Sequence, residues 1–510
     1  MPSLLMQSVG LCRVNIVNKI VLRMSSTQLT YEDAIQKLNL LQSNIATIKQ
    51  IRKDIKAGQQ NTNLQDMNNY LMRTGVTMHM LDQLSVIHVA GTKGKGSTSA
   101  MCESILRAYG FRTGFYSSPH LVAVRERIRL NGRMLSKCQF AEYFHQVYDA
   151  LYESKTVDGD MPKYFSFLTV LAFNVFLKEK VDVAIIEVGI GGIVDYTNIL
   201  RKVPVVGITS LGLDHTSILG NTLPEIAAAK AGIMKPDCEA YTVQQPPEAM
   251  AVLRSVASNV KCSLTTIPEF NTYKFQNGCK ITIEIEAYRI NASLAIQLSH
   301  AWMRKARHTI NNLNNQENSD MTNKYIHNDK KCVLVDTLTK ETVIGLKECK
   351  WPGRYQVIKT DYAKFFLDGA HTKESMAICV KWFEENNRDH TKVLIFSATG
   401  DRDATVLLKL LADIDFEDVF FVIPKAYKEV TKANDNYSIL EQRELLLKCD
   451  NHAMTWKLFN ERSKVSTREC VSDVLQCITK KPNVSVLVTG SLHLVGAALS
   501  IIDPNLSEDV

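Results

Sequence analysis

The feature that most constrains this chain is a short apolar run that leads into a glycine-rich loop and then into a helical pattern. Residues 86–89 are rich in β-branched side chains, which is typical of a buried strand. The loop 91–97 reads GTKGKGS, and residues 97–109 carry apolar side chains at helical spacing before Gly110. Such an order gathers backbone N–H groups and the positive end of a helix around one point, which predicts a phosphate-binding site.

The loop is a variant of the usual nucleotide-binding pattern. Val89 stands where the first glycine of GxxxxGK[ST] belongs, and Gly96 separates Lys95 from the hydroxyl of Ser97. Gly94 and Gly96 let the backbone close around phosphate oxygens, and Lys95 offers a cation to the outer phosphates. Taken alone, the segment supports phosphate binding, and a simple glycine-rich turn stays the alternative.

Alternating elements on both sides of the loop predict an α/β protein with two domains. Apolar β runs at 181–188 and 203–209 follow a helical segment at 168–177, which is typical of a parallel sheet. After Trp351 a second pattern begins, with strands expected at 365–367, 393–396, 419–423 and 484–488. We expect an N-terminal P-loop parallel-sheet ATPase domain at 31–350 and a smaller, Rossmann-like α/β domain at 351–510.

Other segments are less regular. Residues 31–41 and 45–55 have helical spacing, and 280–286 alternate like a half-exposed strand. Residues 300–331 are rich in Asn, Lys and His, which predicts a surface insertion. Residues 1–30 contain basic but no acidic residues and are expected to form a mitochondrial leader, the alternative being a disordered extension. Translation from Met24 would give a cytosolic form.

Bulk composition excludes little. The 510 residues carry a net charge of +7, which does not by itself indicate a nucleic-acid partner. None of the 12 cysteines has CxxC spacing, so we expect no zinc or thioredoxin-like motif. No apolar run reaches the length of about 18 residues that a transmembrane helix needs.

Charged residues follow two of the expected strands in the first domain. Glu187 ends one apolar run, and Asp214 and His215 come just after another. The carboxyl ends of parallel strands are where α/β sheets bind ligands, and carboxylate oxygens suit Mg²⁺. Pairing of Glu187 with a lysine or arginine stays the alternative. Lys230 is the one long side chain in an alanine-rich helical stretch that begins with a capping pattern.

The second domain offers a comparable set of polar residues. Asp368 and His371 follow an expected strand, and Arg354 lies 14 residues before Asp368. These side chains could face the first domain across a cleft and bind nucleotide or amino-acid charges. From spacing alone, a salt bridge and a turn are an equal alternative.

Together these segments resemble the folylpolyglutamate synthase family of the Mur ligase superfamily, in its eukaryotic form. The resemblance covers residues 31–500 except the 300–331 region. Thr372 departs from the pattern, since bacterial members often have Asn there. The motifs that carry the resemblance are 88–97 (HVAGTKGKGS), 117–121 (SSPHL), 187–192 (EVGIGG) with Asp195, Thr197 and Asn198, 213–216 (LDHT), and 368–371 (DGAH).

The resemblance implies a reaction and a set of roles. ATP would phosphorylate the terminal γ-carboxyl of a folate, and glutamate would attack the acyl phosphate to give an amide, ADP and phosphate. Lys95, Lys230 and His371 would be catalytic, with His371 and Ser491 placing the glutamate. The ATP site would comprise Gly94, Lys95, Gly96, Ser97, Arg354 and Asp368, and the Mg²⁺ site Ser118, Glu187 and His215.

The resemblance also implies cofactors and partners. ATP and Mg²⁺ are expected, while a carbamylated Lys230 and a bound monovalent cation stay open. The expected partners are folate, L-glutamate and ATP, with no nucleic acid and no integral membrane segment, in a monomer found in mitochondria and cytoplasm. Dihydrofolate synthase shares nearly all these motifs and is the nearest alternative, and a P-loop regulatory ATPase is the alternative of another class.

Overall fold

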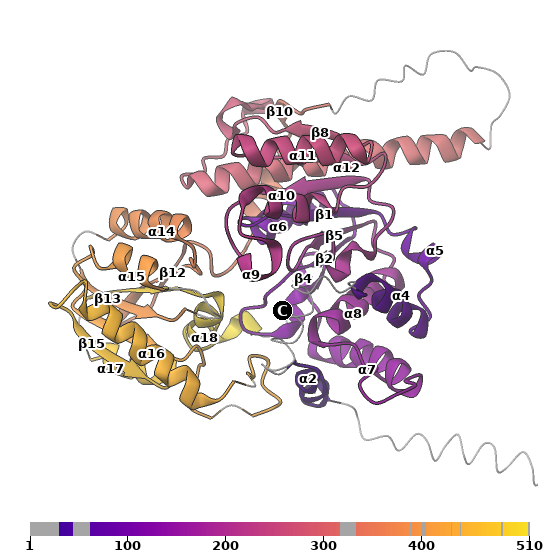
Figure 1. Ribbon diagram of the computed structural model, residues 1–510. Helices are drawn as coiled ribbons and strands as arrows, with labels where there is room; N and C mark the ends of the chain where they lie inside the picture. The colour runs from indigo at the N-terminus through magenta and orange to yellow at the C-terminus, as the bar shows by residue number, and fades with distance from the viewer. Residues whose placement is uncertain are drawn as a thin grey trace, which may run out of the picture.

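Two α/β units stand side by side in the computed structural model (Figure 1). It describes residues 30–43, 62–316, 333–387, 390–398, 404–429, 431–438, 440–480 and 483–507. The leader expected before Thr30 and the helix expected at 45–55 lie outside these ranges. Within them, no helix is long and apolar enough to cross a membrane.

The first unit is built on an eight-stranded sheet with the order β4-β3-β2-β5-β1-β6-β7-β8. Neighbours from β2 to β8 run parallel, as predicted, whereas β3 and β4 add an antiparallel edge that the sequence did not reveal. The strands are β1 (Val86–Ala90), β2 (Thr113–Tyr116), β3 (Ile128–Leu130), β4 (Arg133–Met134), β5 (Val183–Glu187), β6 (Val205–Ile208), β7 (Glu239–Thr242) and β8 (Ser263–Thr266).

Helices cover both faces of this sheet, which is why its central strands are apolar on both sides. In β1, Ile87 and Val89 pack into one hydrophobic cluster, and Val86 and Ala90 into the other. One face carries α6 (Lys95–Ala108), α12 (Glu286–Gln316) and α13 (Lys340–Glu348). The other carries α2 (Tyr31–Leu40), α4 (Asn63–Arg73), α7 (Lys137–Glu153), α8 (Tyr164–Lys178), α10 (Leu223–Ala231) and α11 (Pro247–Asn259), with the short α5 (Met78–Leu81) beside them.

The second unit has a six-stranded sheet with the order β11-β12-β16-β13-β14-β15, parallel except for β11. All four strands predicted here are present. The strands are β11 (Gln356–Lys359), β12 (Ala363–Leu367), β13 (Thr391–Phe396), β14 (Asp418–Val422), β15 (Lys464–Arg468) and β16 (Val484–Thr489). Helices α14 (Lys373–Glu385), α15 (Thr405–Leu411) and α16 (Gln442–Lys457) pack on one face, and α17 (Val471–Ile478) and α18 (Leu492–Ile502) on the other.

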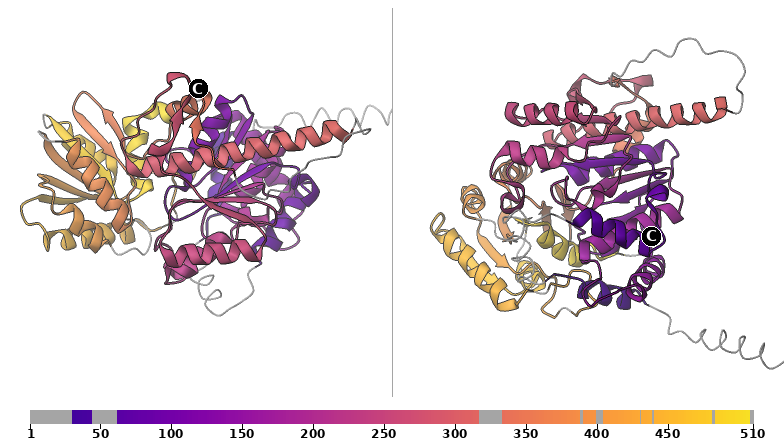
Figure 2. Two further views of the ribbon diagram at one scale, coloured as in Figure 1. Left: turned by 90° about the horizontal axis from the view of Figure 1, so that it is seen from above. Right: turned by 45° about the vertical axis from the view of Figure 1, so that its right-hand side comes forward.

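Two sequence-based expectations differ from the structure, both around α12. Residues 280–285 form no strand, and the alternation there leads directly into the helix that begins at Glu286. The insertion expected from residue 300 does not begin there, because α12 continues to Gln316 and buries Trp302 against α6 and the sheet. Figure 2 shows this long helix running across the first unit. Packing of its apolar stripe outweighs the loop-like composition of its second half.

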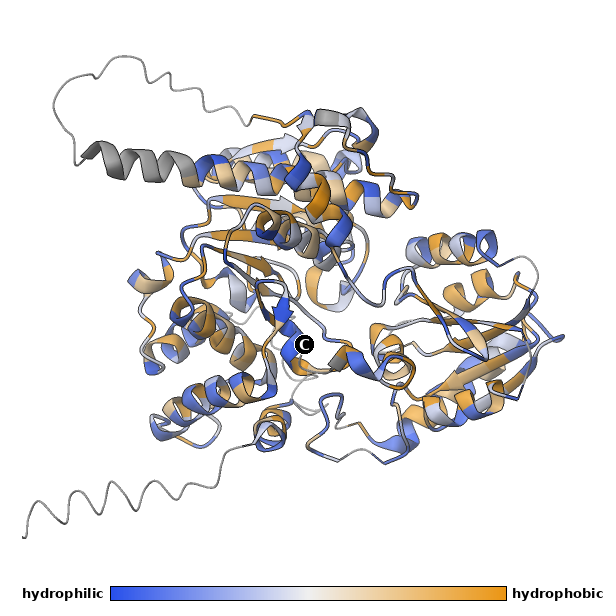
Figure 3. Cartoon of the chain, turned by 180° about the vertical axis from the view of Figure 1, so that it is seen from behind, coloured by the Kyte–Doolittle hydropathy of each residue, from blue (hydrophilic) through white to orange (hydrophobic). Residues whose placement is uncertain are grey.

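The remaining elements are short. β9 (Lys274–Phe275) and β10 (Thr337–Leu338) form a parallel pair, and α9 (Thr216–Leu219) follows β6. Figure 3 shows the strands of the first sheet to be mostly hydrophobic. Single 3₁₀ turns occur at η1 (Val124–Arg127), η2 (Tyr196–Ile199), η3 (Phe270–Thr272), η4 (Gln276–Gly278) and η5 (Pro504–Ser507).

Candidate active site

The glycine loop connects the end of β1 to the start of α6, as predicted. Gly94 has φ 86° and caps α6, and a Cβ there would lie 2.2 Å from Asn291 Oδ1. At Gly91, with φ 151°, a Cβ would lie 1.8 Å from Thr209 Oγ1. Both positions therefore need glycine for backbone conformation and for space. The N–H groups of the first turn of α6 have no partner within that helix and can bind an anion.

Gly96, which breaks the usual loop pattern, lies in the first turn of α6 close to the Trp351 ring and the Glu187 carboxylate. A Cβ there would lie 2.9 Å from the Trp351 ring and 3.3 Å from Glu187 Oε2. The glycine thus lets α6 approach both the segment that leads to the second domain and the carboxylate at the end of β5. Close packing of α6 therefore explains why a glycine, Gly96, separates Lys95 from Ser97.

We expect Gly96→Ala to lower activity far more than stability. Alanine gains helix propensity of about 0.5–1 kcal/mol, which offsets part of an overpacking cost of about 1–3 kcal/mol. Since Glu187 or Trp351 must shift, we expect kcat/KM to fall at least about tenfold. Gly212→Ala is the control, because a Cβ there meets nothing within 4 Å. Steady-state rates and thermal unfolding measure both effects, and a Gly96→Ala enzyme with unchanged rates would contradict this account.

Two lysines converge on the glycine loop from different helices. Lys95 Nζ donates to the Gly91 carbonyl at 3.2 Å, and Lys230 Nζ donates to the same oxygen at 2.8 Å. Lys230 is 4% exposed, and α10 lies so close that a Cβ on Gly192 would be 2.6 Å from Ala229 O. Burial, and then the charge of Lys95, lowers the pKa of Lys230 to about 7. A large fraction of Lys230 is therefore a neutral amine near neutral pH.

Glu187 is the buried carboxylate of the site, at the carboxyl end of β5. It is 4% exposed, and its Oε2 accepts a hydrogen bond from the backbone N–H of Ser118 at 3.2 Å. Burial raises the pKa of Glu187, while the charges of Lys95, Arg354 and Arg127 lower it. A cation close to this carboxylate would offset the desolvation of its charged form.

A hydrogen bond joins two of the three residues predicted to hold Mg²⁺. Ser118 and Glu187 are in contact, whereas His215 lies beyond β6 with its Nε2 3.8 Å from Asp214 Oδ2. Among the described residues, no group of three or more His, Cys, Asp or Glu side chains could hold a metal by itself. Mg²⁺ commonly takes one or two carboxylates and completes its shell with phosphate and water, so a buried carboxylate with a neighbouring serine fits this ion.

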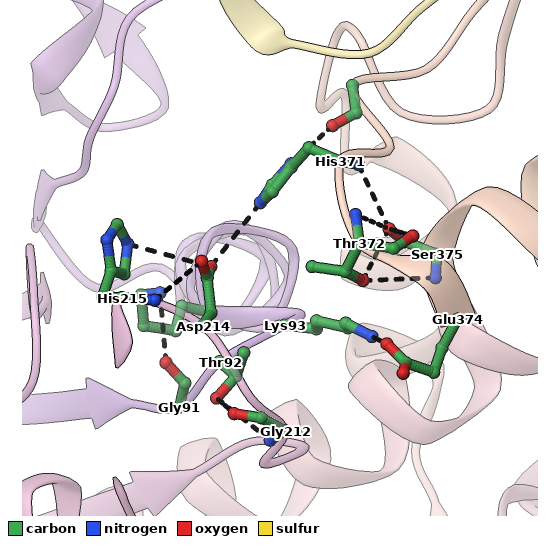
Figure 4. A network of polar contacts seen from close by, with 12 residues as sticks. Gly91, Thr92, Lys93, Gly212, Asp214, His215, His371, Thr372, Glu374 and Ser375 are labelled. Atoms are coloured by element: carbon green, nitrogen blue, oxygen red, sulfur yellow. Dashed lines mark hydrogen bonds and ion pairs between the residues drawn. The ribbon is translucent and has the colours of Figure 1, made fainter. Parts of the chain in front are cut away.

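Asp214 lies between the two units and faces a histidine from each. His371 Nε2 from the second unit is 3.7 Å from Asp214 Oδ2, and His371 Nδ1 donates to Gly369 O at 2.7 Å. Lys93 of the glycine loop also pairs with Glu374 of α14 at 2.5 Å (Figure 4). These contacts bring the 368–371 motif to the glycine loop, so the predicted residues of both units face one another.

Arg354 and Asp368 lie together at the start of the second unit. Asp368 is 4% exposed, and its Oδ2 accepts the Tyr355 N–H at 3.1 Å. Burial raises the pKa of Asp368, and the Arg354 charge lowers it. Ser491 instead uses its hydroxyl to cap α18, accepting the Leu494 N–H at 3.2 Å.

Comparison with known proteins decides the family. The human protein "Folylpolyglutamate synthase, mitochondrial" is 37% identical over 94% of this chain and 92% of its own length. A Saccharomyces cerevisiae folylpolyglutamate synthase is 36% identical over 93% of this chain and 87% of its own length. The chain belongs to the folylpolyglutamate synthase family.

The fold agrees with that of a bacterial folylpolyglutamate synthase. The Mycobacterium tuberculosis enzyme complexed with ADP superposes with a TM-score of 0.67 and 22% identity, covering 90% of this chain and 99% of that one. Residues 353–501 also match a family model described as "Dihydrofolate synthetase, C-terminal domain". That match lies within the second unit, whereas the folylpolyglutamate synthase relatives extend over both.

Two features of the candidate site were not predicted from the sequence. Asn291, 7% exposed, lies against Gly94 but sits in α12 without any local motif. The contact of Asp214 with His371 joins segments 157 residues apart, and Asp214 had been noted only as the neighbour of His215. Polar residues just after expected strands indicated Asp214 and His371 separately. Nothing in the sequence indicated that the two are in contact.

Proposed function

We propose that this chain is a tetrahydrofolylpolyglutamate synthase, an ADP-forming ligase that adds L-glutamate to the γ-carboxyl of folates. The observation that carries the proposal is the meeting of two charged sets. Lys95, Lys230 and Glu187 surround the glycine loop, and His371 of the second unit reaches Asp214 beside them. A regulatory P-loop ATPase would not need a second domain with polar residues facing its loop.

The chemistry asks the protein mainly for positioning and charge neutralisation. A carboxylate is a poor electrophile, and transfer of the ATP γ-phosphoryl group gives it a good leaving group. Gly94, Lys95, Gly96 and Ser97 would bind the phosphates, through backbone N–H groups and the Lys95 ammonium. Arg354 and Asp368 would complete the ATP site from the second domain. His371 is proposed to orient the incoming glutamate, since its ring is held by Gly369 O.

Mg²⁺ fits the same edge of the first sheet. Ser118, Glu187 and His215 are the residues proposed to hold it. When bound, it would neutralise charge on the transferred phosphoryl group. The residues of the chain keep the nucleotide and the folate carboxylate in line while water is kept out.

We further propose that Lys230 is carbamylated in the active enzyme. Its neutral amine is the form that reacts with CO₂, and the lowered pKa, about 7, makes that form abundant. A carbamate is an anionic oxygen ligand, whereas an ammonium would be repelled by a divalent cation. A carbonyl signal from carbon-13 bicarbonate should appear in the wild-type NMR spectrum and be absent from Lys230→Ala. An active preparation with no such signal would refute the modification.

Partners and location follow the relatives. The proposed substrates are folate, L-glutamate and ATP. The enzyme is proposed to be a monomer and to bind a monovalent cation as an additional ligand. The mammalian relatives carry "mitochondrial" in their names, which supports a mitochondrial pool, and a start at Met24 would supply a cytoplasmic one. Imaging of reporter fusions to residues 1–30 tests the mitochondrial part, and a purely cytosolic signal would refute it.

Dihydrofolate synthase is the second candidate, because the matched C-terminal family model bears that name. Purified protein is incubated with ATP, Mg²⁺ and labelled glutamate, with tetrahydrofolate in one reaction and dihydropteroate in another. We expect label to enter products from tetrahydrofolate and not from dihydropteroate. Incorporation from dihydropteroate alone would reverse the assignment.

A further inference from the structure

One loop of the second domain packs against the first domain. This loop is far in sequence from every motif described above. We call residues 431–438 the interdomain clamp. They lie between β14 and α16 of the second domain. Their polar groups contact residues 120–124 of the first domain and helix α2. The contacted segment begins two residues after Ser118, a proposed ligand of Mg²⁺.

Asp435 makes the central contacts of the clamp. Its Oδ1 accepts the Val124 N–H at 2.7 Å and also the hydroxyl of Tyr31 on α2. Its carbonyl accepts His120 Nε2–H at 3.2 Å, while His120 Nδ1 accepts Arg127 Nε–H at 2.9 Å. Because Arg127 can only donate, His120 carries its proton on Nε2, toward the clamp. Asp435 thus binds both ends of the 120–124 segment, at His120 and at Val124.

The Asn436 side chain binds backbone carbonyl groups of the same segment. Asn436 Nδ2 donates to Leu121 O at 3.0 Å and to Val122 O at 3.1 Å. The N–H groups of Leu121, Val122 and Ala123 are instead bound by the carboxylate of Glu126, at 2.7–3.0 Å. Glu126 of the first domain therefore satisfies the N–H groups of residues 121–123, whereas the clamp satisfies the Val124 N–H and the carbonyls of Leu121 and Val122.

Packing reinforces these hydrogen bonds. Leu121 is 7% exposed and belongs to the hydrophobic core of the second domain rather than to that of its own. A Cβ on Gly496 of α18 would lie 2.0 Å from Leu121 O, so the backbones of the two domains touch at this point. The second domain therefore packs directly on the backbone of this segment.

A second set of contacts ties the clamp to α2. Asn39 Nδ2 donates to Lys432 O at 2.8 Å and to Asn434 O at 2.9 Å. Gln42 Nε2 donates to Tyr437 O at 3.0 Å. Because these bonds do not involve the side chains of Asp435 or Asn436, changing either side chain leaves the loop attached to the first domain.

We propose that Asp435 and Asn436 are positioning residues that set Ser118 in place, so that the metal site is complete only when the second domain is docked. The inference rests on the proposed function for the role of Ser118. The chain of contacts is direct: the clamp fixes residues 120–124, these continue the strand-end loop that contains Ser118, and the Ser118 N–H donates to Glu187 Oε2 at 3.2 Å.

The test measures how strongly Mg²⁺ improves nucleotide binding in the full-length chain. The affinity for a non-hydrolysable ATP analogue is determined by calorimetry with Mg²⁺ and with EDTA. We expect Asp435→Ala to reduce the Mg²⁺-dependent gain by about 10- to 100-fold, as loss of residues that orient metal ligands does. Asp435→Asn keeps the Oδ1 acceptor and should restore most of it. Asn436→Ala, a milder change, should act in the same direction.

Tyr31→Phe is the matched control, because it removes one hydrogen bond to Asp435 without altering the bond to Val124. It should leave the Mg²⁺-dependent gain unchanged. The inference is overturned if Asp435→Ala and Asn436→Ala fold, by thermal unfolding, yet keep the wild-type gain. It is equally overturned if Tyr31→Phe loses the gain as they do.

The outcome for the clamp is separate from that for the proposed function, because the calorimetry needs no folate. Failure of the wild-type chain to transfer glutamate would refute the ligase, whatever the clamp variants do. A wild-type ligase whose clamp variants keep the full Mg²⁺-dependent gain would refute the clamp alone.

Discussion

Lys95→Ala is expected to lower kcat by about 100- to 1,000-fold, the loss seen when one preorganised group that stabilises transition-state charge is removed. Lys95 opens α6 and lies beside the glycine loop, with its ammonium on the Gly91 carbonyl. Its charge would stabilise negative charge on the transferred phosphoryl group. The lost contact is one hydrogen bond to a backbone oxygen, so thermal unfolding should change little. Single-turnover ADP formation measures the chemical step directly.

Lys93→Ala is the matched control in the same loop. Lys93 pairs with Glu374 of the second domain on the protein surface, and such exposed pairs contribute about 0–1 kcal/mol. We expect its rate to stay within about tenfold of wild type. Equal losses in the two variants would show that charge near the loop, rather than Lys95 itself, matters. Wild-type turnover in Lys95→Ala would remove Lys95 from the ATP site.

Glu187→Gln should lower activity by a comparable factor, about 100-fold or more, and raise the Mg²⁺ concentration needed for half-maximal rate. The amide keeps the shape of the side chain and an oxygen that can accept the Ser118 N–H. It removes only the negative charge that would bind the cation. Stability should not fall, because burial disfavours the charged carboxylate in the absence of a cation. A Mg²⁺ titration of the rate, together with thermal unfolding, measures both properties.

Glu103→Gln separates this effect from the general loss of a buried carboxylate. Glu103 is 5% exposed in α6 and is bound by Thr113 and Arg107, away from the glycine loop. Its replacement should affect stability and leave the Mg²⁺ requirement unchanged. An unchanged Mg²⁺ requirement in Glu187→Gln would exclude Glu187 as a metal ligand.

The local elements of the site were predictable from sequence, because each has a short-range cause. The β-branched run before Gly91 and the helix after Gly94 follow from side-chain spacing and glycine conformation. The order of parallel strands then places the end of β1 between Glu187 on one side and the segment after β6 on the other, since β1 lies between β5 and β6. Strand-end carboxylates are therefore a sequence signal with a geometric consequence.

What the sequence could not predict depends on contacts between distant segments. Residues 300–316 have a loop-like composition, yet they are helical because they continue α12. The first half of α12 is held by its packing in the core. The lowered pKa of Lys230 depends first on its burial and then on the charge of Lys95, which shares its carbonyl partner, and neither can be predicted from local sequence. Asp435 lies in a polar loop without any motif, and only the docked second domain reveals its partners.

The residues proposed to bind the substrates are divided between the two sheets. The glycine loop and Glu187 belong to the first domain, whereas His371 and Asp368 belong to the second. Separation of the domains would split the site, and docking through the interdomain clamp would assemble it. Such closure keeps water from a reactive acyl phosphate.

The most direct test of a ligase is the stoichiometry of ADP release against glutamate transfer. Wild-type protein is supplied with ATP, Mg²⁺, tetrahydrofolate and labelled glutamate, and both ADP and folate products are quantified. The account predicts a ladder of lengthened folates with one ADP released per glutamate added, and little ADP when glutamate or folate is omitted. ATP hydrolysis at the same rate without folate, and with no lengthened product, would contradict it.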